Sequence, residues 1–191
     1  MLLILEANEG GGKTSIANGL LELHPDWILC KRWTHKLDND KFGFGQWDLR
    51  EAFFYDWRFF LEMLTYDHAF DKHTFVCDRS FITDYVFNKA IWPEHMTERY
   101  MQYWAAYNKQ LQTIPHLVIY CKRSIDKNGF NDIAMHNWSM DAEHWQRLEQ
   151  AYKDWRAETS LHVLNIDNDW YDIDSNVEFI DAYLESLCVG K

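Results

Sequence analysis

Three consecutive glycines followed by lysine and threonine stand near the N-terminus, from Gly10 to Thr14. Glycines let backbone N–H groups turn inward around phosphate oxygens, and a helix that begins at the same place adds the positive end of its dipole. The lysine can reach the outer phosphates of a nucleotide, and the threonine hydroxyl can bind Mg²⁺. This spacing predicts a phosphate-binding loop. Its predicted phosphate-binding residues are Asn8, Glu9, Gly10, Gly11, Gly12, Lys13, Thr14 and Ser15.

The segments on either side of the glycines support this interpretation. The apolar run 2–5 is typical of a buried strand, and apolar residues recur at helical spacing from Ile16 to Leu21. A strand, a glycine turn and a helix in this order are the context that a phosphate-binding loop requires. Ala7 departs from the pattern G-x-x-x-x-G-K-[ST], which has its first glycine at that position. An ordinary glycine-rich turn before a helix is the alternative.

Polar residues also follow three later apolar runs that are typical of strands. Lys31 and Arg32 follow the second predicted strand, Asp78 and Arg79 the third, and Lys122 and Arg123 the fourth. Because ligands of parallel sheets bind at the carboxyl ends of the strands, these groups are expected to surround one cleft. There Asp78 can hold Mg²⁺ beside Thr14, and Arg79 can bind a phosphate through two hydrogen bonds. The alternatives are a helix cap for Asp78 and a surface ion pair for Arg79.

Strands alternate with helices along the chain, and the strands are short apolar runs without polar alternation. Strands are predicted at 2–5, 27–30, 74–77, 116–121 and 161–166, and helices after the glycines and at 48–70, 80–89, 96–112, 141–158 and 175–187. This order predicts an α/β protein with a parallel sheet of about five strands and helices on both faces. Residues 1–191 are expected to form one domain, with a loop at 33–47 and a short polar lid at 122–140.

The composition restricts the expected partners and location. The formal net charge of -11 disfavours nucleic acid as a partner, because affinity for a polyanion comes largely from lysine and arginine. No run is apolar enough for a membrane span or a signal peptide, so a cytoplasmic protein without membrane contact is expected. The four cysteines are far apart in the sequence and are expected to be free thiols in a reducing compartment.

Three segments together resemble the thymidylate kinases, a family of P-loop nucleotide kinases. They are residues 6–14, the helical segment 54–58 and the motif Asp78-Arg79-Ser80. The resemblance implies the three-layer P-loop kinase fold. It also implies phosphoryl transfer from ATP, with Mg²⁺, to a deoxynucleoside monophosphate, with dTMP as the first candidate. A homodimer is implied as well, and the apolar helical patterns at 48–70 and 96–112 agree with one.

The resemblance assigns the acceptor site to five matching residues. Phe54 would stack on the acceptor base, and Arg58, four residues later, would contact the acceptor. Arg79 would bind the acceptor phosphate. Thr83 and Phe87 would line the base pocket.

Two departures from that family concern the charges around the transferred phosphate. The family's Arg-Glu-Pro sequence after the second strand is absent, and Arg32 takes the place of its arginine. The lid of related enzymes supplies a catalytic arginine, but residues 125–145 contain none, so Arg123, Lys122 or Arg147 would replace it. Glu9 would orient the acceptor sugar or neighbouring cations. The predicted catalytic residues are Lys13, Glu9, Arg79 and Arg123.

The sequence is also compatible with three other functions. A deoxynucleoside kinase shares the architecture and has an aspartate- or glutamate-Arg-Ser motif similar to Asp78-Arg79-Ser80. Relatives of that type, however, carry a glutamate just after the second strand, where this chain has none. A phage-type kinase for a modified base or a nucleic-acid end would use the aromatic-rich region 42–60 to stack a base. A nucleotide-binding switch without turnover would account for Ala7 and the lid without arginine.

Overall fold

The computed structural model of the chain describes residues 1–8, 10–30, 69–124 and 142–188. Its five-stranded sheet has the order β2-β3-β1-β4-β5, and every neighbouring pair of strands is parallel. The elements are β1 (Leu2–Glu6), α1 (Lys13–Leu23), β2 (Ile28–Cys30), α3 (Ala69–Lys72), β3 (Phe75–Asp78), α4 (Phe81–Ile91), η2 (Pro93–His95), α5 (Glu98–Leu111), β4 (His116–Lys122), α7 (Ala142–Glu158), β5 (Val163–Asp167) and α8 (Ile173–Cys188). The predicted α/β fold with a parallel sheet is confirmed.

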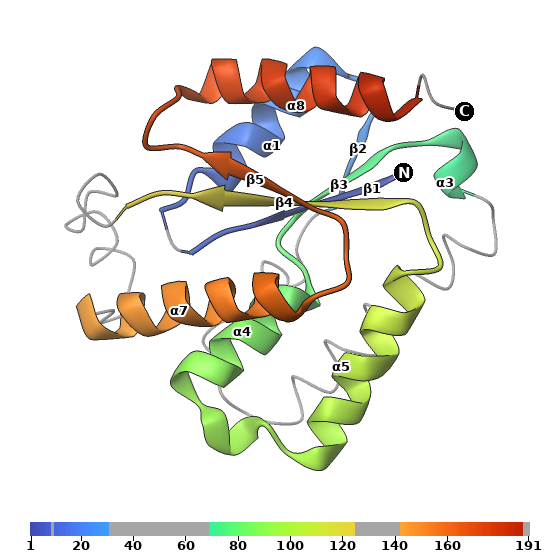
Figure 1. The fold of residues 1–191 in the computed structure, drawn as a ribbon. Helices are drawn as coiled ribbons and strands as arrows, with labels where there is room; N and C mark the ends of the chain where they lie inside the picture. The colour runs from blue at the N-terminus through green and yellow to red at the C-terminus, as the bar shows by residue number, and fades with distance from the viewer. Residues whose placement is uncertain (9, 31–68, 125–141, 189–191) are drawn as a thin grey trace, which may run out of the picture.

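Helices cover both faces of the sheet (Figure 1). α1 and α8 lie on one face, and α4, α5 and α7 lie on the other. In β1, Leu3 and Leu5 pack in the core below α1 and α8, whereas Leu2 and Ile4 pack in the opposite core. Successive residues of a strand point to opposite faces, so a strand that fills two cores must be apolar at every position. This explains why β1 is uninterrupted by polar residues until Glu6.

The strand order predicts a ligand site beside β1. The chain adds β3 and β2 on one side of β1 and later adds β4 and β5 on the other. Where connections leave a parallel sheet in opposite directions, the carboxyl ends of the strands border a ligand-binding crevice. The glycine loop follows β1 at this point.

Several boundaries differ from the prediction by a few residues. β4 extends to Lys122, so the first residue of the predicted lid belongs to the sheet. β5 begins at Val163, two residues later than predicted, and Leu161 lies before it, buried in the core on the α7 side of the sheet. The predicted loop at 33–47, nearly all of the predicted helix at 48–70 and most of the predicted lid lie outside the described residues.

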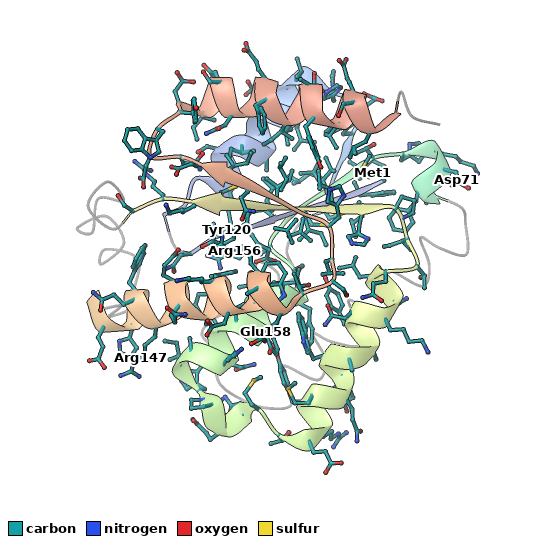
Figure 2. All side chains as sticks on the ribbon, in the orientation of Figure 1. Met1, Asp71, Tyr120, Arg147, Arg156 and Glu158 are labelled. Carbon is teal, nitrogen blue, oxygen red and sulfur yellow. The ribbon has the colours of Figure 1, made fainter. Side chains whose placement is uncertain are left out.

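α7 is attached to the sheet by Tyr120 and Arg156, which lie together between β4 and the helix (Figure 2). The Arg156 guanidinium is 4.0 Å from the centroid of the Tyr120 ring, and Nη1 of Arg156 donates a hydrogen bond of 2.8 Å to Asn165. The Tyr120 hydroxyl donates to Glu149 of α7 at 3.1 Å. These contacts fix α7 along β4 and so position Tyr152, which reaches the end of β1.

Two expectations from the composition can be checked in the described part of the chain. Cys30, Cys77 and Cys121 are free thiols, as predicted. Among the described helices, none combines the length and the apolar character that crossing a membrane requires.

Candidate active site

The glycine loop packs closely against the ends of β1 and β4. Gly10 and Gly12 have φ angles of 73° and 83°, in the left-handed region that glycine adopts at little cost. A Cβ on Gly11 would lie 2.5 Å from Cβ of Ala7 and 2.9 Å from the carbonyl oxygen of Cys121. Ala7 itself is fully buried in the core on the α1 side. The fold thus accommodates alanine at the position where the sequence pattern has glycine.

α1 begins directly after the loop and brings Thr14 to the end of β3. Gly12 is the N-cap residue, and Lys13, the first helical residue, is only 8% exposed. The hydroxyl of Thr14 donates a hydrogen bond of 2.6 Å to Oδ2 of Asp78. Val76 packs in the core on the α1 side, and Asp78, two residues later, faces the same side. The structure therefore brings together Thr14 and Asp78, the two predicted metal ligands.

The oxygen atoms of Thr14 and Asp78 fit a magnesium ion that accompanies a nucleotide. Mg²⁺ binds one or two protein oxygens together with phosphate oxygens and waters. Oδ1 of Asp78 is buried and has no hydrogen-bond partner among the described residues. A buried carboxylate oxygen without a partner is unfavourable until a cation or another ligand reaches it.

Arg79 has the one positive φ angle, 79°, among the described residues other than glycine. Such a backbone conformation costs of order 1–3 kcal/mol and is concentrated at functional sites. The turn leaves the Arg79 side chain only 4% exposed and sets its guanidinium 5.6 Å from the ring centroid of Phe87 on α4. Arg79 and Phe87, both predicted at the acceptor site, are therefore together. A guanidinium held in this way is suited to bidentate binding of a phosphate.

Glu6 is the last residue of β1 and is fully buried. The sequence analysis gives it no catalytic or binding role. Its Oε1 accepts hydrogen bonds of 2.8 Å from both the N–H and the hydroxyl of Ser80. Its Oε2 accepts from the hydroxyls of Thr83, at 2.5 Å, and Tyr152, at 3.1 Å. Burial raises the pKa of the carboxyl above 4.5, although these donors and Arg79 oppose the shift. The sequence signal is an acidic residue at the end of an otherwise apolar strand.

Three other predicted binding residues have different surroundings. The hydroxyl of Thr83, predicted to line a base pocket, is engaged by Glu6. The side chain of Asn8 is buried and donates to the carbonyl of Trp145 at 3.1 Å. Ser15 is exposed in the first turn of α1. Thr83 and Asn8 thus connect the site to α4 and α7 through their own hydrogen bonds.

Of the three candidates for the missing lid arginine, Arg123 lies beside the glycine loop. Its Nη1 is 3.5 Å from the carbonyl oxygen of Gly10. Lys122 instead forms an ion pair of 3.7 Å with a carboxylate at the end of β5. Arg147 pairs with Glu143, one turn earlier on α7.

The loop between β5 and α8 supports the glycine loop, and the sequence analysis did not identify it. The side chain of Asn168 donates a hydrogen bond to the carbonyl of Gly11, and buried Asn176 donates to Asn168 at 2.7 Å. Both carboxylate oxygens of Asp169 accept from the N–H of Ser124, at 2.9 and 2.8 Å. A run of short polar residues directly after the last strand is the signal that could have identified this loop.

Four predicted site residues lie outside the described part of the chain. The structure therefore does not test the acceptor and catalytic roles that the sequence gives them. They are Glu9, Arg32, Phe54 and Arg58.

Solved structures resemble the chain, but no protein-family model and no curated protein matches it. Deoxyadenosine kinase from M. mycoides, with the products dCMP and dCDP bound, has a TM-score of 0.61 at 18% identity and covers 97% of this chain and 100% of its own. The same enzyme with bound dATP has a TM-score of 0.63 at 19% identity, with the same coverage.

The YorR protein from Bacillus subtilis, in complex with phosphorylated GDP, is also similar. Its TM-score is 0.63 at 15% identity, and the alignment covers 97% of this chain and 96% of that protein. At this level of identity, the likenesses establish the fold alone. The chain has the α/β fold of the P-loop nucleotide kinases, as the sequence predicts.

Gly11→Ala should weaken ATP binding by about 10-fold or more, a loss of about 1.4 kcal/mol, because the added methyl collides with Ala7 and with the backbone of β4. Isothermal titration calorimetry measures the affinity. Gly19→Ala is the matched control, since its Cβ would lie 2.7 Å from Val177 in the α1–α8 interface, away from the loop. Equal ATP affinities of the two variants would contradict the role given to Gly11.

Glu6→Gln should change the pH dependence of stability. The pKa of Glu6 is higher in the folded protein than in the unfolded chain. Protonation of Glu6 therefore contributes fully to the free energy of unfolding below pH 4.5, and this contribution is lost as the pH rises through the pKa of the folded state. The glutamine variant lacks this titration. The free energy of unfolding of the wild type relative to the variant should therefore fall as the pH rises above 4.5, in urea unfolding at a series of pH values. A difference that is constant with pH would refute this assignment.

Proposed function

We propose that this protein is a kinase that transfers the terminal phosphoryl group of ATP to a deoxynucleoside monophosphate, with dTMP as the first acceptor to test. The observation that carries the proposal is the hydrogen bond of 2.6 Å between Thr14 and Asp78 beside the glycine loop. It sets a hydroxyl and a carboxylate next to a lysine at a helix N-terminus, which is the combination that a nucleotide triphosphate with its metal ion requires.

The donor phosphates would bind to the glycine loop and to Lys13. The loop offers backbone N–H groups, and Lys13 adds a positive charge at the N-terminus of α1, where the helix dipole also favours an anion. Thr14 and Asp78 would hold Mg²⁺, whose charge lowers the repulsion among the phosphate oxygens. Since Lys13 is nearly buried, its charge acts through a lower dielectric than it would in water.

The acceptor would bind at Arg79. Its guanidinium would hold the acceptor phosphate so that one oxygen attacks the γ-phosphorus while the bond to the β–γ bridging oxygen breaks and ADP leaves. Arg123, beside the loop carbonyl of Gly10, would offset the charge on the transferred group. The acceptor is already an oxyanion, so this reaction needs no general base.

Other parts of the proposal rest on the sequence. Phe54 and Arg58 would bind the acceptor base and phosphate, Arg32 would add a further cation, and Glu9 would orient the acceptor sugar. The homodimer likewise rests on the helical pattern and on the resemblance to thymidylate kinases.

A deoxynucleoside 5′-kinase is the second candidate. The observation that favours it is the similarity to deoxyadenosine kinase from M. mycoides over 97% of this chain. The motif Asp78-Arg79-Ser80 also resembles the aspartate- or glutamate-Arg-Ser motif of deoxynucleoside kinases. The two candidates share a donor site and differ in the acceptor, which is a sugar hydroxyl in one case and a phosphate in the other.

A coupled assay of ADP release tests the acceptor. Purified protein with ATP and Mg²⁺ should turn over deoxynucleoside monophosphates, with dTMP among them, and should leave deoxynucleosides and a single-stranded oligonucleotide unchanged. Turnover with deoxynucleosides alone would establish the second candidate and refute the first. ATP binding without turnover of any acceptor would support a nucleotide-binding switch.

Lys13→Ala should lower kcat by about 100- to 1000-fold, because it removes a charge aimed at the transferred phosphate. The matched control is Lys109→Ala, at an exposed position of α5. Urea unfolding of both variants shows whether each is folded in the assay, so that a loss of turnover can be assigned to the missing charge. A Lys13→Ala variant with full turnover would overturn the donor site proposed here.

A further inference from the structure

Glu6 lies on the acceptor side of the sheet edge. In β1, Leu2 and Ile4 point into the core of α4, α5 and α7, and Glu6 continues this series. It therefore meets α4 and α7, on the face opposite α1 and its Thr14. Its two carboxylate oxygens accept four hydrogen bonds within the protein, so its lone pairs are fully used. A carboxylate engaged in this way is suited to holding other groups in place.

Consecutive residues of β1 hold the backbone N–H groups that precede and follow the strained φ and ψ angles of Arg79. The N–H of Arg79 donates to the carbonyl of Leu5 at 2.9 Å, and the N–H of Ser80 donates to Oε1 of Glu6 at 2.8 Å. A positive φ persists in a residue other than glycine only where neighbouring contacts enforce it. The Leu5 carbonyl and the Glu6 carboxylate supply such contacts before and after the φ–ψ pair of Arg79.

The same carboxylate also fixes the start of α4. The hydroxyl of Ser80 donates to Glu6 and accepts from the N–H of Ile82 at 3.1 Å, as the N-cap of α4. Thr83, in the first turn of α4, donates to Glu6 as well. α4 carries Phe87, whose ring lies against the Arg79 guanidinium. Glu6 therefore holds both the backbone of Arg79 and the helix that supports its side chain.

We propose that Glu6 is a positioning residue for Arg79, which its carboxylate holds in the orientation that binds the acceptor. The inference rests on the proposed function, in which Arg79 contacts the acceptor phosphate. Glu6 itself touches no substrate in this scheme. Since Lys13 and Thr14 approach from the other face of the sheet, loss of Glu6 should affect the acceptor much more than ATP.

Steady-state kinetics of matched variants test this role. Glu6→Ala removes all four hydrogen bonds, whereas Glu6→Gln can keep them. The amide oxygen of glutamine accepts from Ser80, and its NH₂ group donates to the hydroxyls of Thr83 and Tyr152, which can rotate to accept. Leu184→Ala is the control for general destabilisation, because Leu184 is buried in the core on the other face of the sheet.

Glu6→Ala should raise the KM for the acceptor by about 30-fold or more and the KM for ATP by less than about 3-fold. Glu6→Gln should have an acceptor KM within about 3-fold of the wild-type value. Leu184→Ala should change neither KM. Equal changes of both KM values in Glu6→Ala would overturn the proposal, because a merely structural residue would act in that way. A glutamine variant as impaired as the alanine variant would also overturn it.

Tyr152→Phe keeps the inference testable if Glu6→Ala does not fold. It removes one of the four hydrogen bonds that orient the Glu6 carboxylate and keeps those from Ser80 and Thr83, so the hold on Arg79 should loosen in part, raising the acceptor KM by about 3- to 10-fold and leaving the ATP KM unchanged. An unchanged acceptor KM would count against the proposal.

Two further measurements separate failure of this inference from failure of the proposed function. Arg79→Met in the same assay reports whether Arg79 binds the acceptor at all. Crystal structures of the wild type and of a Glu6 variant report the φ angle of Arg79 without any turnover. Suppose that Arg79→Met raises the acceptor KM, whereas Glu6→Ala changes neither the φ angle of Arg79 nor the acceptor KM. The proposed function then stands, and the positioning role of Glu6 fails. If the wild type phosphorylates no acceptor, the proposed function fails, and a φ near 79° in Glu6→Ala would refute the positioning role independently.

Discussion

Side chains of a strand alternate between the two sides of the sheet, and the candidate site depends on this constraint together with the left-handed turn at Arg79. Asp78 faces α1 and meets Thr14, whereas Arg79 turns to the other side and meets Phe87. The side chains at the end of β1 also lie on opposite sides of the sheet. Glu6 faces α4 and α7, and Ala7 is buried on the α1 side. The sheet edge therefore separates the groups that we propose for the donor nucleotide from those that we propose for the acceptor.

The placement of charge follows from the same arrangement. The chain is acidic overall, with a formal net charge of -11, yet Lys13 and Arg79 are almost fully buried at the strand ends. Taking a cation out of water costs free energy that a bound anion can offset. An acidic surface around a few inward-facing cations favours a small, highly charged ligand in the crevice and disfavours an extended polyanion on the surface.

The sequence allowed the fold, and the proximity of Asp78 to Thr14 beside the glycine loop, to be predicted, because the elements that carry them are encoded locally. Apolar runs that fill two cores identify the strands, and the glycines, Lys13 and Thr14 lie within five consecutive residues. Thr14 and Asp78 could be paired because each follows a strand that was recognisable by itself.

The roles of Glu6 and Asn168 could not be predicted in this way. The partners of Glu6 come from β3, α4 and α7, and Tyr152 is 146 residues away in the sequence. Asn168 supports Gly11 across 157 residues. Such contacts depend on how elements pack, and no short pattern encodes them. Ala7 shows the reverse case, where a local pattern implied a defect that packing removes.

The support of Gly11 by Asn168 has a consequence for biosynthesis. The carbonyl of Gly11 is held by Asn168, which in turn is held by Asn176 of α8. A ribosome makes Gly11 157 residues before Asn168, at about 5–20 residues per second. The glycine loop therefore gains this support only after α8 has been made, and a nascent chain that still lacks α8 carries the loop without these contacts.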